Sequence, residues 1–431
     1  MKITRRALLA GTASLSGTVA LPGYLRAQSA GTEIQVQYST PVLFKALMED
    51  LARTFMERNP SIRVTLRAPE LGYEEIMQRN LRDAVTNQLP DVAFHGLNRQ
   101  RTLDERGIPV DLKPFMEADP AATKELGYSP SLLSLGQIGA KQTGIGFALS
   151  TPILYFNADL LKAAGGDPDR LPTRWDELVG LAAAIHDPAQ NRTGLFYDWT
   201  ITGNWGWQAL VRSHGGAFLN PAETQVAFTE EPGRQAMCAL RRLVDEAKMP
   251  DIKSETAFQD MFAGRLGISM QSTAQLGRYN REIAGRFRLV CGRYPLASPD
   301  ARLPAGGNAA MMFAKDPGKQ KAAWEFIKFA TGPQGATMMV NATGYMPATT
   351  IPAEREDLLA KFYRENPNHL VSIKQQDVIT GWYAFPGQNA LRITDVINDH
   401  LQSVVAKRGD AEATNESMGK AVQALLPKRA V

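Results

Sequence analysis

From residue 33 onward, segments in which apolar and polar residues alternate with the period of a β-strand are followed by segments with the period of an α-helix. Residues 33–38 (EIQVQY) and 62–66 alternate as a half-buried strand does, whereas residues 44–55 and 73–85 carry an apolar stripe at helical spacing. A short apolar run, DVAF, follows at 91–94. A strand-helix-strand-helix-strand order requires parallel strands joined by right-handed crossovers, so the pattern predicts an α/β fold.

The same periods predict further elements later in the chain. Strands are predicted over 264–270, 286–291 and 306–314, and helices over 316–331, 395–405 and 416–426. Before them lies the stretch FALSTPILYFN, residues 147–157, in which Pro152 to Phe156 form the apolar, aromatic-rich run of a buried strand. Ser150 and Thr151 stand directly before that run. Two hydroxyls and a proline at the entrance of a core strand indicate that this position does more than begin a strand.

The first thirty residues differ from the rest. They begin with basic residues, continue through a mildly apolar middle and reach small residues around Ala27 and Ala30. This is the pattern of an export signal peptide over residues 1–30. The adjacent Arg5 and Arg6 favour the twin-arginine type, which exports folded proteins, and an ordinary signal with two arginines is the alternative.

Composition and charge then narrow the class of protein. A length of 431 residues with 44% hydrophobic and 21% charged residues suits a globular chain of two or more lobes. The leader holds four basic residues and no acid, so cutting after Ala27 takes the formal charge of +4 to about zero. We therefore expect no nucleic acid partner.

The chain after the leader has no apolar stretch of about 18 residues, and no cysteine near the cleavage region could take a lipid anchor. We expect a protein of the periplasm. The two cysteines, Cys238 and Cys291, could form a disulfide in that compartment, although two separate buried thiols are favoured.

Motifs for catalysis are missing from the sequence. The five histidines show no metal-ligand spacing, and no nucleophile elbow, phosphate-binding loop or calcium loop is present. We therefore expect no metal, no cofactor and no catalytic residue, which makes a binding protein more plausible than an enzyme.

Several stretches taken together resemble one family. In chain order they are RTFMERNPSIRV, GYEEIMQRNLRDAVTNQLPDVAF, STPILYFNADLLKAAGGDP, LPTRWDELVGLAAAI, FQDMFAGRLGISMQST, AGGNAAMMF and KAAWEFIKFATGPQGATMMVNATGYMPA. Their order and content are similar to the extracellular solute-binding proteins of ABC importers, family 1. STPILYFN and TGYMPA are most similar to the glycerol-3-phosphate-binding branch.

The resemblance implies a periplasmic binding protein type II fold, in which two α/β lobes are joined by a hinge and the ligand lies in the cleft between them. It places residues 31–148 with 274–331 in the N-terminal lobe, and 149–273 with 332–431 in the C-terminal lobe. Ser150 and Thr151 would then lie where the chain crosses between lobes, with their hydroxyls facing the cleft. Open parallel sheets bind ligands beyond the carboxyl ends of their strands, which agrees with this placement.

The resemblance also implies a set of ligand-binding residues. They are Tyr38, Tyr73, Ser150, Trp205, Trp207, Ser272, Gly307, Tyr345 and Trp382. Trp205 and Trp207 would face the same side of an extended segment, where their rings could cover the C–H faces of a sugar. Structural roles compete with these assignments: Ser39 and Thr40, after Tyr38, could serve only as helix caps, and the tryptophans could be core residues.

Two departures from the glycerol-3-phosphate branch affect the expected ligand. The stretch 382–389 (WYAFPGQN) has no arginine where that branch carries one for the phosphate, and HGLN at 95–98 stands where a glutamate is expected. These departures favour a neutral sugar or polyol over a phosphorylated one as the ligand. The expected partners are a small hydrophilic solute and the permease subunits of an ABC importer, with the binding protein a monomer. A secreted carbohydrate-active enzyme and a ligand-presenting receptor for a membrane sensor are the alternatives.

Overall fold

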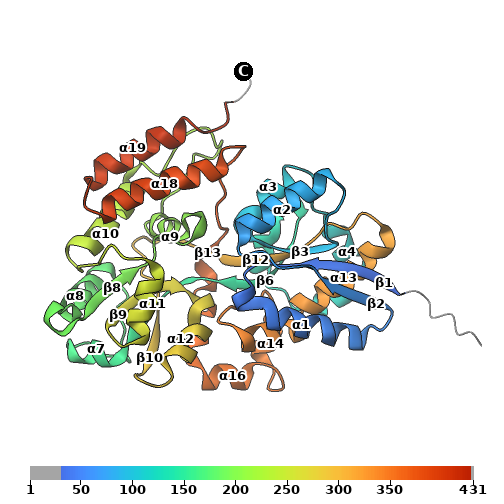
Figure 1. The fold of residues 1–431 in the computed structure, drawn as a ribbon, viewed down its shortest axis with the longest axis horizontal. Helices are drawn as coiled ribbons and strands as arrows, with labels where there is room; N and C mark the ends of the chain where they lie inside the picture. Colours follow the sequence, from blue (N-terminus) through green and yellow to red (C-terminus); the bar gives the residue numbers. More distant parts are fainter. Residues whose placement is uncertain (1–30, 429–431) are drawn as a thin grey trace, which may run out of the picture.

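The computed structural model describes residues 31–428, which form two lobes side by side (Figure 1). Lobe 1 is built on a five-stranded sheet in the order β2-β1-β3-β12-β6. Its strands are β1 (Thr32–Gln37), β2 (Ile62–Leu66), β3 (Val92–Gly96), β6 (Ile145–Ser150) and β12 (Gly306–Met312). β1 pairs in parallel with both β2 and β3, which confirms the predicted crossovers through α1 (Pro41–Arg58) and α2 (Tyr73–Val85).

Lobe 2 is built on a four-stranded sheet in the order β10-β7-β9-β8. Its strands are β7 (Pro152–Asn157), β8 (Thr193–Tyr197), β9 (Leu266–Ser272) and β10 (Leu289–Arg293). The helices α18 (Ala390–Val405) and α19 (Ala411–Gln423) pack on α10 (Glu231–Asp245) and lie at the top of this lobe in Figure 1. Apolar stripes on these helices bury Met237, Ile397 and Met418 in the core of lobe 2.

The other elements are shorter or lie around the two sheets. The helices are α3 (Gln100–Asp104), α4 (Lys113–Ala118), α5 (Pro120–Glu125), α6 (Pro130–Leu133), α7 (Ala158–Ala163), α8 (Trp175–Ile185), α9 (Trp205–Ser213), α11 (Ser254–Phe262), α12 (Leu276–Ile283), α13 (Pro317–Thr331), α14 (Pro333–Ala342), α15 (Ile351–Glu354), α16 (Ala360–Glu365) and α17 (Leu370–Ile373). The two-residue strands are β4 (Gln137–Ile138), β5 (Lys141–Gln142), β11 (Leu303–Pro304) and β13 (Ile379–Thr380).

The chain passes between the lobes within the stretch that the sequence marked. β6 ends at Ser150 in the sheet of lobe 1, and β7 begins at Pro152 in the sheet of lobe 2. Thr151, between them, is fully buried, and its Oγ1 lies 2.8 Å from Ser372 Oγ and accepts from Gln375 Nε2 at 2.8 Å. The crossing is therefore as expected, but the Thr151 hydroxyl joins a buried cluster at the crossing and does not line the pocket described below.

Parts of residues 274–331 and of residues 332–431 lie with a different lobe from the one that the resemblance implied. α12 packs beside α11, and β10 pairs with β7, so residues 276–293 belong with lobe 2 and not with lobe 1. α14 packs on α1 and α13, so residues 333–342 belong with lobe 1. Periodicity identifies a helix or a strand, but the sheet that it joins depends on its packing partners, which the local pattern does not encode.

The leader, residues 1–30, lies outside the described residues, as does the predicted twin-arginine pair. Among residues 31–428 no helix combines the length and the apolar character needed to cross a membrane. In the same part of the chain Cys238 and Cys291 are both free thiols, on α10 and β10.

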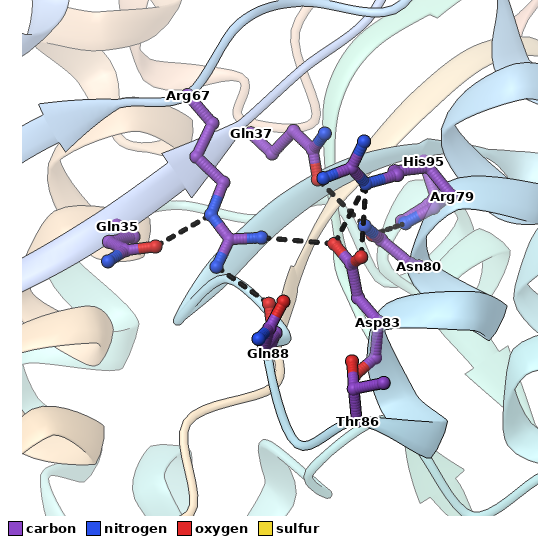
Figure 2. Close-up of polar contacts among 9 residues, drawn as sticks. All are labelled: Gln35, Gln37, Arg67, Arg79, Asn80, Asp83, Thr86, Gln88 and His95. Carbon is purple, nitrogen blue, oxygen red and sulfur yellow. Dashed lines mark hydrogen bonds and ion pairs between the residues drawn. The ribbon is translucent and has the colours of Figure 1, made fainter.

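A buried polar network holds α2 against the sheet of lobe 1 (Figure 2). Asn80 of α2 donates from Nδ2 to Gln37 Oε1 of β1 at 2.7 Å, and its Oδ1 accepts from His95 Nε2 of β3 at 2.8 Å. One turn later, Asp83 accepts from Arg67 at 3.2 Å. Buried polar groups are stable only when they are partnered, so this network fixes where α2 lies, including its first turn at the pocket between the lobes.

His95 should make the protein sensitive to acid. Burial lowers the pKa of His95 from its ordinary value of 6.5 to about 3, because the charged imidazolium would lose its water. Between those values the unfolded chain takes up a proton that the folded chain excludes. The free energy of unfolding should therefore fall with pH from about 6.5 toward about 3, by up to about 1.4 kcal/mol per pH unit from this residue.

Urea denaturation across this pH range, with wild-type protein and the His95→Gln variant, measures the effect. The variant should have a shallower slope because it carries no titrating ring at this position. NMR of the ring provides an independent check, since the His95 signal should show no titration above about pH 4. A midpoint near 6.5 for His95 would contradict the prediction.

Candidate functional site

A pocket of about 240 Å³ lies between the two lobes. Lobe 1 contributes residues from the loops that follow β1 and β2, from the end of β6 and from the start of β12, and lobe 2 contributes residues from the start of α9 and the end of β9. The lining residues are Thr40, Leu43, Gly72, Tyr73, Glu74, Ser150, Ile201, Thr202, Trp205, Ser272, Ala274, Gln275, Gly306, Gly307, Tyr345 and Trp382.

Glycines let strand β12 approach the pocket closely. Gly307 has φ of +97°, and a Cβ there would lie 1.8 Å from the Ala148 carbonyl oxygen. A Cβ on Gly306 would lie 2.6 Å from Ser150 Oγ. Only glycine therefore fits both positions without moving the neighbouring backbone or the pocket wall.

Three aromatic rings form one wall. The Trp382 ring meets the Tyr73 ring nearly edge-on, at 6.3 Å and 80°, and lies 6.2 Å from the Trp205 ring. Trp205 Nε1 and Trp382 Nε1 are buried and have no hydrogen-bond partner among residues 31–428. Buried N–H groups are nearly always partnered in stable proteins, so a ligand with acceptor oxygens would complete this wall.

Two tyrosine hydroxyls lie in the same pocket. Tyr73 Oη accepts from Asn308 Nδ2 at 3.3 Å, and burial raises the pKa of Tyr73 above its ordinary value. Burial, with a smaller contribution from the neighbouring Tyr73, also raises the pKa of Tyr345 well above its ordinary value. Both phenols therefore stay protonated at neutral pH, and the Tyr345 hydroxyl is hydrogen-bonded to the Tyr73 hydroxyl, so the two hydroxyls form a connected pair at the pocket wall.

The lining carries little charge. Glu74, in the first turn of α2, is the only acidic residue in it, and lysine, arginine and histidine do not contribute to it. The Glu74 carboxylate forms an ion pair with Arg99, whose side chain is only 5% exposed. The pocket thus combines hydroxyls, indole N–H groups and aromatic faces with one carboxylate, whose partner Arg99 does not line it.

Residues 50–368 match the model of a family described as bacterial extracellular solute-binding protein. The chain belongs to this family. It is 24% identical over 296 residues to the sn-glycerol-3-phosphate-binding periplasmic protein UgpB of Pectobacterium atrosepticum, a match that covers 65% of each protein. The chain thus spans just under two thirds of the length of that relative. It is also 22% identical over 394 residues to a putative binding protein of Brucella abortus, covering 88% of this chain and 90% of that protein.

Solved structures share the fold. UgpB of Mycobacterium tuberculosis, in complex with glycerophosphocholine, superposes with a TM-score of 0.80 at 20% identity and covers 92% of this chain and 98% of its own. The cyclic α-maltosyl-1,6-maltose binding protein of Arthrobacter globiformis has a TM-score of 0.76 at 20% identity, covering 92% and 99%. The two lobes therefore have the fold of the periplasmic binding proteins, as the sequence predicted.

The structure of this solute-binding protein brings most of the predicted ligand residues together. Those that line the pocket are Tyr73, Ser150, Trp205, Ser272, Gly307, Tyr345 and Trp382. Tyr38 does not line it, since its side chain packs in the core of lobe 1. Thr40 lies at the start of α1 but makes no side-chain cap, so the competing role that the sequence suggested is not formed.

Trp207 also lies away from the pocket, because the segment that carries it is not extended. Residues 205–213 form α9, and two residues along a helix turn the side chain to nearly the opposite face. Trp205 lines the pocket, whereas Trp207 is fully buried in the core of lobe 2 against Phe218 and Phe228.

Several lining residues had no signal that the sequence analysis used. Glu74 stands next to the predicted Tyr73, and Thr202 lies in the loop before α9. Polar residues that follow a strand in an open α/β sheet are candidates in general, so the β2–α2 loop could have drawn attention to Glu74. Thr202 becomes recognisable only when the two lobes are placed together.

Polar contacts join the lobes, one of them between two residues that line the pocket. Thr202 Oγ1 of lobe 2 donates to Glu74 Oε1 of lobe 1 at 2.5 Å. Arg101 of lobe 1 donates from Nη1 and Nη2 to the two carboxylate oxygens of Glu223 of lobe 2, both at 2.7 Å. Tyr383 Oη also donates to Glu223, at 3.1 Å. Such contacts require the lobes to be closed on each other.

A larger hollow, of about 600 Å³, lies beside the network of Figure 2. Most of its charged groups already pair with one another, such as Arg67 with Asp83, and Lys319 with Asp91 at 3.0 Å. It draws on lobe 1 alone. The pocket between the lobes, with unpartnered donors and walls from both lobes, is the better candidate for ligand binding.

Proposed function

We propose that this protein is the substrate-binding component of an ABC importer and that its solute is neutral, rich in hydroxyls and no larger than a single sugar ring or a short polyol. The proposal is based on the chemistry of the pocket between the lobes, whose lining has hydroxyl and indole donors and aromatic faces but no cationic side chain. Each ligand hydroxyl can find a partner there while the rings cover its C–H faces. Family membership supports the transport role.

The size of the pocket supports a small solute. Its volume, about 240 Å³, lies below the roughly 300–1,000 Å³ typical of pockets for drug-sized ligands. The relatives bind solutes of several kinds, including glycerophosphocholine in one solved structure and ribitol in that of a protein from Agrobacterium radiobacter. Among these chemistries, the lining of this pocket favours an uncharged polyol.

The proposed mechanism is capture by closure, with no chemical step. The solute enters between open lobes, and the contacts of Thr202 with Glu74 and of Arg101 with Glu223 form as the lobes close. The closed monomer, in the periplasm, then presents its solute to the permease subunits.

A thermal-shift screen tests this function. We expect the melting temperature to rise with at least one member of a panel of glycerol, ribitol and single sugars, since a ligand that binds only the folded state stabilises it. Recovery of the ligand unchanged after incubation separates binding from the enzymatic alternative. A panel without any shift, or a ligand that is turned over, would contradict the proposal.

Tyr345→Phe should weaken the binding of that ligand by roughly five- to a hundredfold, because a buried hydrogen-bonding partner is lost at a cost of about 1–3 kcal/mol. Isothermal titration calorimetry measures the change. Tyr363→Phe is the matched control: it removes a buried hydroxyl that has no hydrogen-bond partner among the described residues and does not line the pocket. Equal affinities for both variants would exclude Tyr345 from recognition.

A further inference from the structure

Glu74 is a lining residue that pairs with a buried arginine and also contacts the other lobe. Its Oε1 accepts from the Arg99 guanidinium and from Thr202 Oγ1 across the lobes. Its side chain is 25% exposed, whereas that of Arg99 is 5% exposed, and Arg99 does not line the pocket. The negative charge therefore faces the ligand space, and the positive charge lies behind it.

The surroundings hold this pair in place. Glu74 lies in the first turn of the 13-residue helix α2, where the helix dipole favours a negative charge. Arg99 is buried, and its Nε has no hydrogen-bond partner within the part of the chain that the structure describes. The positive charge of Arg99 is thus balanced by the Glu74 carboxylate, with which it forms an ion pair.

This arrangement of charges would affect the binding of a charged solute. The phosphate of a phosphorylated polyol would meet the Glu74 carboxylate first and the Arg99 charge only behind it, so repulsion would exceed attraction. A neutral polyol has no such penalty and can donate a hydroxyl to the carboxylate.

We propose that Glu74 is the residue that sets the solute class, excluding phosphorylated polyols and admitting neutral ones by masking the buried charge of Arg99. The inference rests on the proposed function and adds to it the residue that determines specificity. It predicts that the pocket would bind phosphorylated polyols if the Glu74 carboxylate were removed.

The Glu74→Gln variant tests this inference. Glutamine keeps the size and an acceptor oxygen for Arg99 and Thr202 but removes the charge, which leaves the positive charge of Arg99 uncompensated close to the pocket. We expect sn-glycerol 3-phosphate to bind this variant at least about tenfold more tightly than it binds the wild type, with affinity falling as salt is added. Calorimetry with sn-glycerol 3-phosphate as the probe gives the comparison.

Two further variants isolate the cause. Glu75→Gln removes the same charge from the next residue, which is exposed and does not line the pocket, and it should leave phosphate binding as in the wild type. The Glu74→Gln and Arg99→Gln double variant should lose the gain. Thermal unfolding checks that each variant is folded, and Glu74→Ser replaces Glu74→Gln if that one is not.

The outcomes separate the two proposals. Failure of Glu74→Gln to gain phosphate binding, a gain that survives in the double variant, or a wild type that prefers sn-glycerol 3-phosphate to every neutral polyol would overturn the role of Glu74. A wild type that binds no neutral member of the panel would contradict the proposed function alone, because the comparison of variants uses the phosphorylated probe and still decides the role of Glu74.

Discussion

Replacing Trp207 by alanine is expected to lower the free energy of unfolding by about 3–5 kcal/mol. The side chain is fully buried, with the Phe228 ring edge-on at 5.1 Å and the Phe218 ring at 5.3 Å. Removing the indole leaves a cavity that these rings cannot fill without moving α9. Urea denaturation measures the loss, and the ligand affinity of the fraction that stays folded should be close to that of the wild type.

Trp205→Ala is the matched comparison, two residues away on the same helix. Its ring lines the pocket and contacts Trp382, so the variant should lose binding by roughly tenfold or more, because an aromatic face and an N–H donor leave the ligand. Its loss of unfolding free energy should be smaller than that of Trp207→Ala. If the two variants lost stability and affinity in the same proportions, the assignment of one ring to the core and the other to the pocket would be wrong.

Gly307→Ala is expected to cost about 3 kcal/mol or more of unfolding free energy and to weaken ligand binding. An alanine at φ of +97° is strained, and its methyl group would lie 1.8 Å from the Ala148 carbonyl oxygen. Relief requires β12 to move away from β6, which displaces the pocket wall next to Ser150. Thermal unfolding and calorimetry on the same preparation measure both effects.

Gly180→Ala provides the control for Gly307→Ala. Gly180 lies on the exposed side of α8, and a Cβ there would meet no atom within 4 Å. Alanine in a helix is favoured over glycine, so this variant should gain about 0.5–1 kcal/mol of stability and leave binding unchanged. A similar response of both glycines would show that the close approach of β12 to β6 is not a constraint.

The sequence alone determined the first strands and helices of this protein. Local periodicity is a direct record of which side chains face the core, so the strands and helices of residues 32–96 were predicted in the right order and in parallel pairing. The hydroxyls and the proline before Ile153 marked this stretch as unusual because a core strand alone does not require them, and the family resemblance then identified it as a crossing between lobes.

The resemblance to a known family located many of the pocket residues but not their arrangement. Trp205 and Trp207 have the same chemistry and nearly the same position in the sequence, and only the helical conformation of α9 sends them to opposite sides. Tyr38 follows the first strand, as a ligand residue would, yet packing turned its ring into the core of lobe 1. Local sequence restricts a backbone, but the face that a side chain takes depends on the surface that packs against it.

Only the tertiary structure showed how the charged residue of the pocket is paired and which segments belong to each lobe. Glu74 and Arg99 are 25 residues apart in the sequence, and no periodicity predicts that the first masks the second. Residues 276–293 joined lobe 2 through the pairing of β10 with β7, and residues 333–342 joined lobe 1 by packing on α1 and α13. Contacts between segments far apart in the sequence form when the apolar surfaces of folded elements are buried against each other. The pattern of neighbouring residues therefore does not predict which segments will pair.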